Sequence, residues 1–166
     1  MEVKIRLLKE SDYLAYKAIR LEMLEKHPTS FSASYRDTVK ENDDFFRNCV
    51  TAEDNHIFGA FADGILVGVV ALKIPHLDKV KHKGLIWSVY VKPEHHNKSI
   101  ASGLISKLID FARTKLLYLE LACKTNNFHA YKLYKKFGFE VTAVNKYAIK
   151  WESKFYDEYI MRLYLN

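Results

Sequence analysis

Hydrophobic and polar positions along the chain follow two periods, one typical of strands and one of helices. The pattern predicts strands at residues 3–7, 56–62, 65–74, 85–91, 116–122, 139–148 and 159–165, and helices at residues 39–50, 100–113 and 127–137. A further helix is expected from a cap at Ser11 to about Lys26, where Pro28 disfavours helical backbone in the residue before it. Residues 29–37 and 75–83 read as loops. Asp63-Gly64 predicts a tight hairpin turn, and Gly138 a left-handed helix end.

The order of these elements predicts a mixed α/β (α+β) fold with a central, mostly antiparallel sheet and flanking helices. The helix between the strands at 85–91 and 116–122 acts as a crossover, so these two strands should be parallel neighbours. Ligands of open α/β sheets bind at the carboxyl ends of such strands. The turn at residues 93–99 is therefore the expected ligand-binding edge.

Length and composition favour one globular domain over residues 1–166. The sequence is 49% hydrophobic and 28% charged, a balance that leaves no room for a long disordered tail. The start is charged and lacks the apolar core of a signal peptide, and no apolar run approaches the roughly 18 residues that a membrane span needs. Cys49 and Cys123 have no metal or redox spacing. A cytoplasmic protein that does not enter membranes is expected.

The net charge of +6, from 26 basic and 20 acidic residues, raises the question of an anionic ligand. Lysines at positions 73, 79, 81, 83, 92 and 98 outnumber the acidic Asp78 and Glu94 around the expected ligand-binding edge, which favours an anion there. A nucleic acid is the rival partner, but the basic residues are dispersed and no recognition motif is present. The charge alone motivates that hypothesis.

The polar turn from His95 to Ser99 contains no glycine, although turns that hold phosphates are usually glycine-rich. An ordinary connection is the alternative. The phosphate needs main-chain N–H groups, which any residue supplies, and Asn97 tolerates the left-handed region at a cost of about 1–2 kcal/mol. The Ser99 hydroxyl can donate to a phosphate or cap the next helix, and Ala101 keeps close approach nearly open. We interpret the turn as a degenerate anion site.

Two segments resemble the GNAT superfamily (GCN5-related N-acetyltransferases). In residues 89–105, VYVKPEHHNKSIASGLI, His96 stands at the family's Arg or Gln, Ser99 at its first glycine and Ala101 at its Gly or Ala. Residues 127–139, NFHAYKLYKKFGF, keep the family's Asn-x-x-Ala-x-x-Leu-Tyr-x-Lys-x-Gly-Phe pattern intact. The resemblance covers nearly the whole chain, and the second segment is the more specific of the two.

The resemblance implies acetyl-CoA as co-substrate. In this family the parallel strands splay apart, and the pantetheine arm pairs with the exposed strand while helix N–H groups meet the pyrophosphate, aided here by nearby lysines. The expected cofactor-binding residues are Val89, Tyr90, Val91, His96, Asn97, Lys98, Ser99, Ile100, Ala101, Ser102, Asn127 and Tyr134.

The implied reaction is direct attack of an amine on the thioester, with Tyr134 as catalytic general acid. A packing tyrosine is the alternative, just as Asn127 is either a cofactor ligand or a helix cap. A backbone N–H near Val89 is expected to polarise the carbonyl. The general base stays unassigned: a water relayed by Ser88 or His82, or an already deprotonated substrate, would serve.

The expected function is therefore transfer of the acetyl group of acetyl-CoA to a primary amine of a small molecule or peptide. The alternatives are a non-catalytic acyl-CoA sensor of the same fold and a basic nucleic-acid-binding protein. The family's acceptor wall maps to residues that would otherwise be ordinary core, namely Phe31, Tyr35, Tyr147, Trp151 and Tyr156. Histidines at 76, 82, 95 and 96 fit no zinc spacing, so no metal is expected. A homodimer is compatible with the fold, but no residue demonstrates it.

Overall fold

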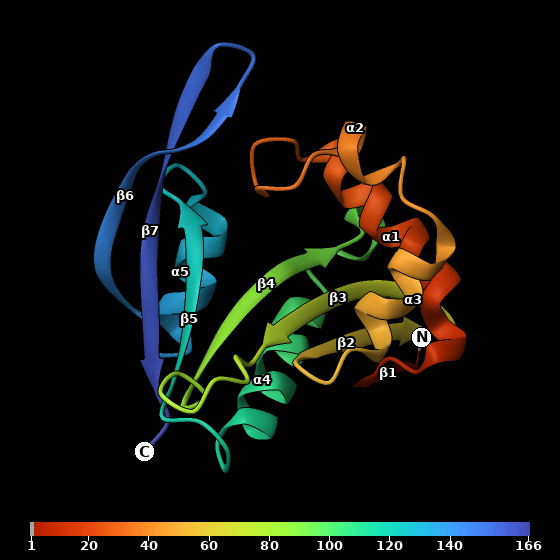
Figure 1. Cartoon of the computed structure of the whole chain (residues 1–166), viewed down its shortest axis with the longest axis horizontal. Coiled ribbons are helices and arrows are strands. Elements are labelled where there is room, and N and C mark those ends of the chain that lie inside the picture. The colour runs from red at the N-terminus through yellow and green to blue at the C-terminus, as the bar shows by residue number, and fades with distance from the viewer. Residues whose placement is uncertain (1) are drawn as a thin grey trace.

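Seven strands form one sheet in the order β1-β2-β3-β4-β5-β7-β6 in the computed structural model, which describes residues 2–166 (Figure 1). The strands are β1 (Val3–Leu7), β2 (Asn55–Ala62), β3 (Ile65–Lys73), β4 (Lys83–Val91), β5 (Tyr118–Lys124), β6 (Glu140–Trp151) and β7 (Lys154–Tyr164). Every neighbouring pair is antiparallel except β4 and β5, which are parallel. The predicted mixed sheet and its parallel pair are confirmed.

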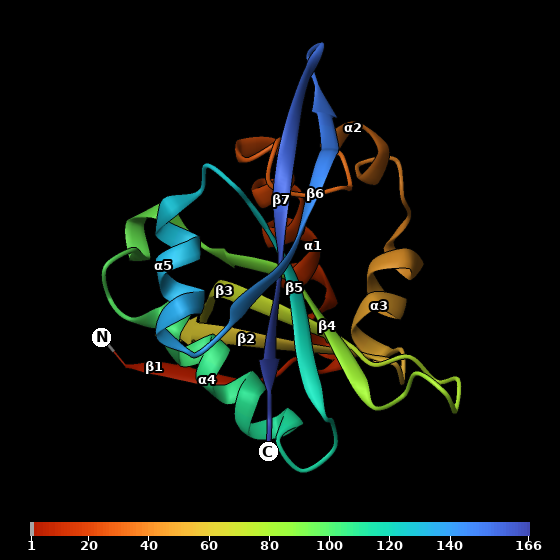
Figure 2. The ribbon, with the colours of Figure 1, turned by 90° about the vertical axis from the view of Figure 1, so that its left-hand side faces the viewer.

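Helices cover both faces of this sheet (Figure 2). They are α1 (Tyr13–Lys26), α2 (Tyr35–Thr38), α3 (Asp43–Thr51), α4 (Ile100–Ala112) and α5 (Phe128–Lys136), with short 3₁₀ turns η1 (Glu10–Asp12) and η2 (Pro93–His95). The face that carries α4 and α5 buries one apolar cluster, in which Leu104 and Leu108 are fully enclosed. The other face, which we call the α1 face, buries a second cluster in which Tyr16, Ile19 and Phe46 are central. The stripe of α4 follows the predicted apolar spacing. In α1 the predicted stripe was wrong, because the helix buries Tyr16, Ile19 and Met23 and leaves Leu14 57% exposed.

The two predicted glycine turns are confirmed. Asp63 and Gly64 have φ of 48° and 83°, and they join β2 to β3 as a turn with two left-handed residues. Gly138 has φ of 92° directly after α5, where an L-residue would be strained.

Several predicted boundaries were wrong. α1 begins after Asp12, not at a Ser11 cap, and Ser11 lies inside η1. The short helix α2 falls across the predicted loop at 29–37, and α3 begins only at Asp43, because the Asn42 side chain accepts a hydrogen bond from the Phe45 N–H. β7 begins at Lys154, five residues before the predicted start at 159, because polar residues continue the hairpin with β6.

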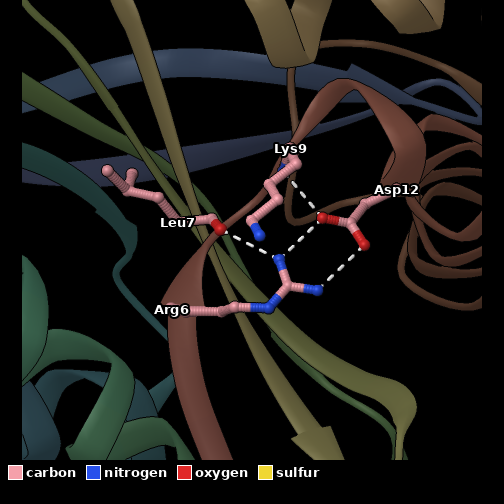
Figure 3. Close-up of polar contacts among 4 residues, drawn as sticks. All are labelled: Arg6, Leu7, Lys9 and Asp12. Carbon is pink, nitrogen blue, oxygen red and sulfur yellow. Dashed lines mark hydrogen bonds and ion pairs between the residues drawn. The ribbon is translucent and has the colours of Figure 1, made fainter.

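A charged clamp fixes the entry into α1 and explains the wrong cap (Figure 3). Asp12 accepts two hydrogen bonds from the Arg6 guanidinium, at 2.7 and 3.0 Å, and a third from the Lys9 N–H at 2.6 Å. Arg6 also donates to the Leu7 carbonyl. The clamp therefore ties the end of β1 to the turn before α1, and the hydrogen bond from Arg6 lowers the pKa of Asp12.

Replacing Asp12 with asparagine should lower the free energy of unfolding by about 1–2 kcal/mol at pH 7, the low end for charged hydrogen bonds because Arg6 stays partly exposed. A depressed carboxyl pKa contributes stability above its unfolded value, 3.8, and loses it as the pH falls through the folded value. The difference between Asp12→Asn and wild type should therefore shrink below about pH 4 in urea titrations. Asp78→Asn is the control, because Asp78 is 91% exposed in its pair with Lys81. A difference that persists unchanged at pH 3 would contradict this assignment.

Candidate active site

The parallel strands β4 and β5 separate soon after they meet. Their pairing covers only Lys83–Leu85 against Tyr118–Glu120. Beyond Leu85 the two strands diverge, as Figure 1 shows. The β5-facing side of β4 from residue 86 onward is thus left without a strand partner, which is the splay that the resemblance implied.

A β-bulge on β4 lies inside this opening. Ala71 pairs with Trp87 and Val69 with Tyr90, so Ser88 and Val89 together face one residue of β3. Ser88 adopts φ of 57°, in the left-handed region that serine rarely enters. Bulges redirect backbone and side chains next to active sites. Here the bulge turns the middle of β4 toward the opening.

The opening forms a cleft of about 1180 Å³. Eleven of the twelve expected cofactor-binding residues line it, namely Val89, Tyr90, Val91, His96, Asn97, Ser99, Ile100, Ala101, Ser102, Asn127 and Tyr134. The exception is Lys98, which lies outside the lining, and its Nζ donates to the Glu94 carbonyl at 3.2 Å. The fold therefore brings the strand, the polar turn and α5 together around one space.

The glycine-free turn adopts the backbone that glycines usually provide. Asn97 and Ser99 have φ of 59° and 57°, and Ser99 is the N-cap residue of α4 without a side-chain cap hydrogen bond. The N–H groups at positions 100 to 102 belong to the first helical turn, so they have no carbonyl acceptor within the helix. Ile100, Ala101 and Ser102 line the cleft, and they form the positive end of a 13-residue helix. The arrangement suits an anion.

Two expected residues use their side chains elsewhere. His96 Nε2 lies 2.8 Å from the Val91 carbonyl, which only accepts, so this nitrogen carries the proton. The Tyr90 hydroxyl donates to Glu22 at 2.8 Å on the α1 face. Tyr90 thus offers the cleft its backbone, and the Val91 carbonyl is already bonded.

Tyr134 lies at the junction of β5, α5 and the cleft. It is 6% exposed and packs its ring against Phe139. Burial, with a smaller contribution from Cys123, raises the pKa of its hydroxyl. Among residues 2–166 this hydroxyl has no hydrogen-bond partner, although Tyr134 lines the cleft. It is therefore a protonated donor that is available to a ligand.

Asn127 caps α5, because its side-chain oxygen accepts from the Ala130 N–H at 3.2 Å. Its amide NH₂ is not used by this cap, and Asn127 lines the cleft. The two alternatives from the sequence, a cap and a ligand contact, are compatible in this geometry.

Sequence reasoning missed the charged residues that β5, β7 and α1 contribute. Lys124 on β5 lies opposite Glu158 on β7 in the strand register, and both residues line the cleft. Burial alone raises the pKa of the half-buried Glu158. Arg20 reaches the cleft from α1 and donates to Ser88 Oγ at 2.7 Å. No spacing in the sequence links these positions, because they meet only through the sheet.

Cys123 also lines the cleft, beside Tyr134 and Glu158. Burial, and then the Glu158 carboxylate, raise the pKa of this thiol to about 11. A thiol with such a pKa is protonated near neutral pH and is a poor nucleophile.

The other residues that the sequence suggested for the site differ in whether they line the cleft. His82 lies outside the cleft lining, with its ring 6.0 Å from that of Tyr118, so it does not reach the cleft. Of the five expected wall aromatics, Phe31 lines the cleft, and Phe31 and Trp151 line an adjacent hollow of about 160 Å³. Tyr147 is 72% exposed on the β6–β7 hairpin.

Comparison with known proteins identifies the class. The model of the acetyltransferase (GNAT) family matches residues 18–139, and the chain belongs to this family. The family, the fold and the expected enzyme class, an acetyl-CoA-dependent acetyltransferase, are confirmed.

Two curated proteins are similar in sequence. N-alpha-acetyltransferase RimI of Mycobacterium tuberculosis is 30% identical over 99 residues, which cover 57% of this chain and 58% of that protein. The chain thus spans little more than half the length of this relative. Streptothricin acetyltransferase of Escherichia coli is 29% identical over 135 residues, which cover 81% of this chain and 75% of that protein.

Solved structures share the fold at lower identity. The yncA protein of Salmonella typhimurium, solved with its cofactor acetyl-CoA, superposes with a TM-score of 0.87 at 22% identity, covering 100% of this chain and 95% of that one. A GNAT-family acetyltransferase from Streptococcus pneumoniae gives 0.85 at 23% identity, covering 99% and 100%. At these identities the likeness concerns the fold.

Two further findings concern residues 2–166. None of the helices there has the length and apolar character to cross a membrane. No three His, Cys, Asp or Glu side chains there gather as metal ligands would.

Proposed function

We propose that this protein transfers the acetyl group of acetyl-CoA to a primary amine of a small molecule or peptide. The observation that carries the proposal is the shared cleft: the unpaired part of β4, the N-terminus of α4 and the Tyr134 hydroxyl all border one space. These are the parts that hold an amide-rich arm, hold a pyrophosphate and protonate a leaving thiolate. Both curated relatives are named as acetyltransferases.

The cofactor would lie along the opening. Its pantetheine amides would pair with the backbone of residues 89–91, as an added strand does. Its pyrophosphate would accept from the N–H groups at the start of α4, where Asn97 and Ser99 shape the turn. Lysine side chains that line the cleft also favour an anionic ligand, and they are Lys124, Lys132 and Lys136.

The chemistry would then proceed by direct attack. The amine nitrogen bonds to the thioester carbonyl carbon, the C–S bond breaks, and the thiolate takes the Tyr134 proton. Burial keeps Tyr134 protonated until that moment, as a general acid must be. The neutral thiol of Cys123 supports direct attack over an acetyl-cysteine intermediate.

Glu158 is our choice for the general base that the sequence left open. It is the acidic residue among the described residues that line the cleft, and it forms no ion pair there. Burial raises its pKa above the ordinary value of a glutamate, which makes the carboxylate a stronger base. The amine's proton would pass to this carboxylate, so the products are the amide and neutral CoA thiol.

Calorimetric titration of acetyl-CoA, followed by an amine screen, tests this function. Wild type should bind with a dissociation constant of roughly 1–100 μM. Ser99→Pro should abolish binding, because proline fixes φ near −65° and Ser99 has φ of 57°.

Ser99→Gly is the matched control. It should retain binding and gain about 1 kcal/mol of stability, since glycine adopts this backbone without strain. Retained binding in the proline variant would refute the turn as the phosphate site. A protein that binds acetyl-CoA but acetylates no amine in a broad panel would instead be an acyl-CoA sensor.

Three narrower expectations accompany the proposal. We expect a single domain over residues 1–166, a cytoplasmic location consistent with the two free cysteines, and amine acceptors in place of nucleic acid as partners. Salt-sensitive binding of a nucleic acid would argue against the last. A homodimer stays a hypothesis.

A further inference from the structure

Arg20 is a buried cation that reaches the cleft from the α1 face of the sheet. Its side chain belongs to α1, and the residue is only 9% exposed. Nη1 donates to Ser88 Oγ at 2.7 Å, and the guanidinium carbon lies 5.1 Å from the Trp87 ring centre and 6.0 Å from that of Phe31. One hydroxyl and two aromatic rings thus hold the guanidinium in place.

No carboxylate neutralises Arg20 in the part of the chain that the structure describes. The nearest acidic residue in sequence, Glu22, is engaged by Tyr90, Lys26 and Lys92. Besides Ser88 Oγ, only the Met23 sulfur, at 4.0 Å, accepts from Arg20 among residues 2–166. A guanidinium cannot shed its charge in a protein, and an unpaired buried charge costs several kcal/mol.

The position of Arg20 separates it from the phosphate site. The turn at residues 97–99 follows the carboxyl end of β4, whereas Ser88 lies at the bulge in the middle of the strand. Val89, the next residue, is where the thioester carbonyl is expected. Arg20 therefore faces the part of the cleft beside the reacting acetyl group, on the face of the sheet that α1 covers.

The unused N–H groups of Arg20 suit a planar anion. A guanidinium presents five donors in a fixed fork, and a carboxylate accepts from two of them at once. The flanking rings of Trp87 and Phe31 hold the fork and exclude water, which strengthens such a pair. An ammonium group beside Arg20 would be repelled.

We propose that Arg20, held by Ser88, binds a carboxylate of the acceptor, so that the preferred substrates are amines that also carry a carboxylate, such as amino acids. The inference rests on the proposed N-acetyltransfer and names its substrate class. Glu158 and Arg20 then divide the acceptor between them, the carboxylate receiving the amine's proton and the guanidinium holding the acid group.

The test compares each acceptor with its carboxamide. Free amino acids, ω-amino acids and short peptides are assayed by kcat/KM, each beside the partner in which the carboxylate is an amide. Wild type should favour the carboxylate member by roughly ten- to hundredfold, the effect of a charge-assisted hydrogen bond. Amidation lowers the amine pKa by removing a nearby negative charge, which favours the amide. A preference for the carboxylate is therefore not an effect of amine ionisation.

Variants assign the preference to Arg20. In Arg20→Met the ratio between the two members should fall to near one, and Arg20→Lys should retain part of it. Arg113→Met is the matched control, because Arg113 is exposed at the end of α4, outside the cleft lining. Folding is checked by thermal melting and by acetyl-CoA binding.

Each other outcome is informative. No carboxylate preference in wild type overturns the proposal whether or not the variants fold. An equal loss on both members in Arg20→Met assigns the guanidinium to the thioester or to the fold, and also overturns it. If no amine is acetylated, the proposed function fails, and calorimetry of amino acid against carboxamide on the CoA complex still decides the inference: tighter binding of the amino acid supports it, and equal binding overturns it.

Discussion

Tyr134→Phe is expected to lower kcat for N-acetylation by about 10²-fold or more, because the thiolate then leaves without a proton donor. The phenylalanine ring keeps the contact with Phe139. The lost hydroxyl has no hydrogen-bond partner among residues 2–166, so thermal stability and acetyl-CoA binding should be unchanged. Steady-state kinetics with one responsive amine, together with calorimetry, measure both.

Tyr131→Phe is the matched control for this experiment. Tyr131 lies three residues earlier on α5, packs its ring at a tilt against that of Tyr159 and is not among the residues that line the cleft. It should behave as wild type. If Tyr134→Phe retains more than about a tenth of the wild-type kcat, its hydroxyl is not the acid and the tyrosine is a packing residue. A large loss of kcat with intact cofactor binding would end the sensor alternative.

Glu158→Gln should lower kcat/KM by about 10²- to 10⁴-fold, the range for loss of a general base. Glutamine keeps the size of the side chain and cannot accept the amine's proton. Burial raises the pKa of Glu158, so the carboxylate form grows as the pH rises through that raised value. Wild-type activity should therefore rise with pH over this window.

The pH profile distinguishes catalysis from structure. In Glu158→Gln the rise of activity with pH that is due to Glu158 should vanish. Only the rise due to deprotonation of the amine should remain. Because burial disfavours the charged form of Glu158, the glutamine variant should melt no lower than wild type. Glu152→Gln, in the exposed turn between β6 and β7, should show neither change. An unaltered profile in Glu158→Gln would exclude this carboxylate as the base.

Local sequence signals were sufficient to predict the main segments that border the cleft. The apolar run at 85–91, the turn before Ile100 and the intact segment from Asn127 are each continuous in sequence, so their order predicts that they meet at one edge of the sheet. Asp63-Gly64 and Gly138 were readable because each requires left-handed backbone. Eleven expected residues line the cleft for this reason.

Other features depend on contacts between distant segments. Arg20 meets Ser88 across 68 positions of the chain, and Glu158 reaches the cleft through its register with Lys124. The left-handed φ of Ser88 follows from the bulge against β3, which no turn residue signals. The Ser11 cap was wrong because Arg6 and Lys9 hold the neighbouring Asp12, a tertiary contact that overrides a local preference.

The divergence of β4 from β5 has a consequence for what the protein admits. A sheet edge normally lies on the outside, where another chain can add to it and aggregation follows. This edge is internal: the polar turn, α5 and the loop before α2 border it. An extended molecule with amide groups can pair with the unpaired backbone of β4 there. The topology thus favours extended molecules as ligands, before any side chain distinguishes one molecule from another.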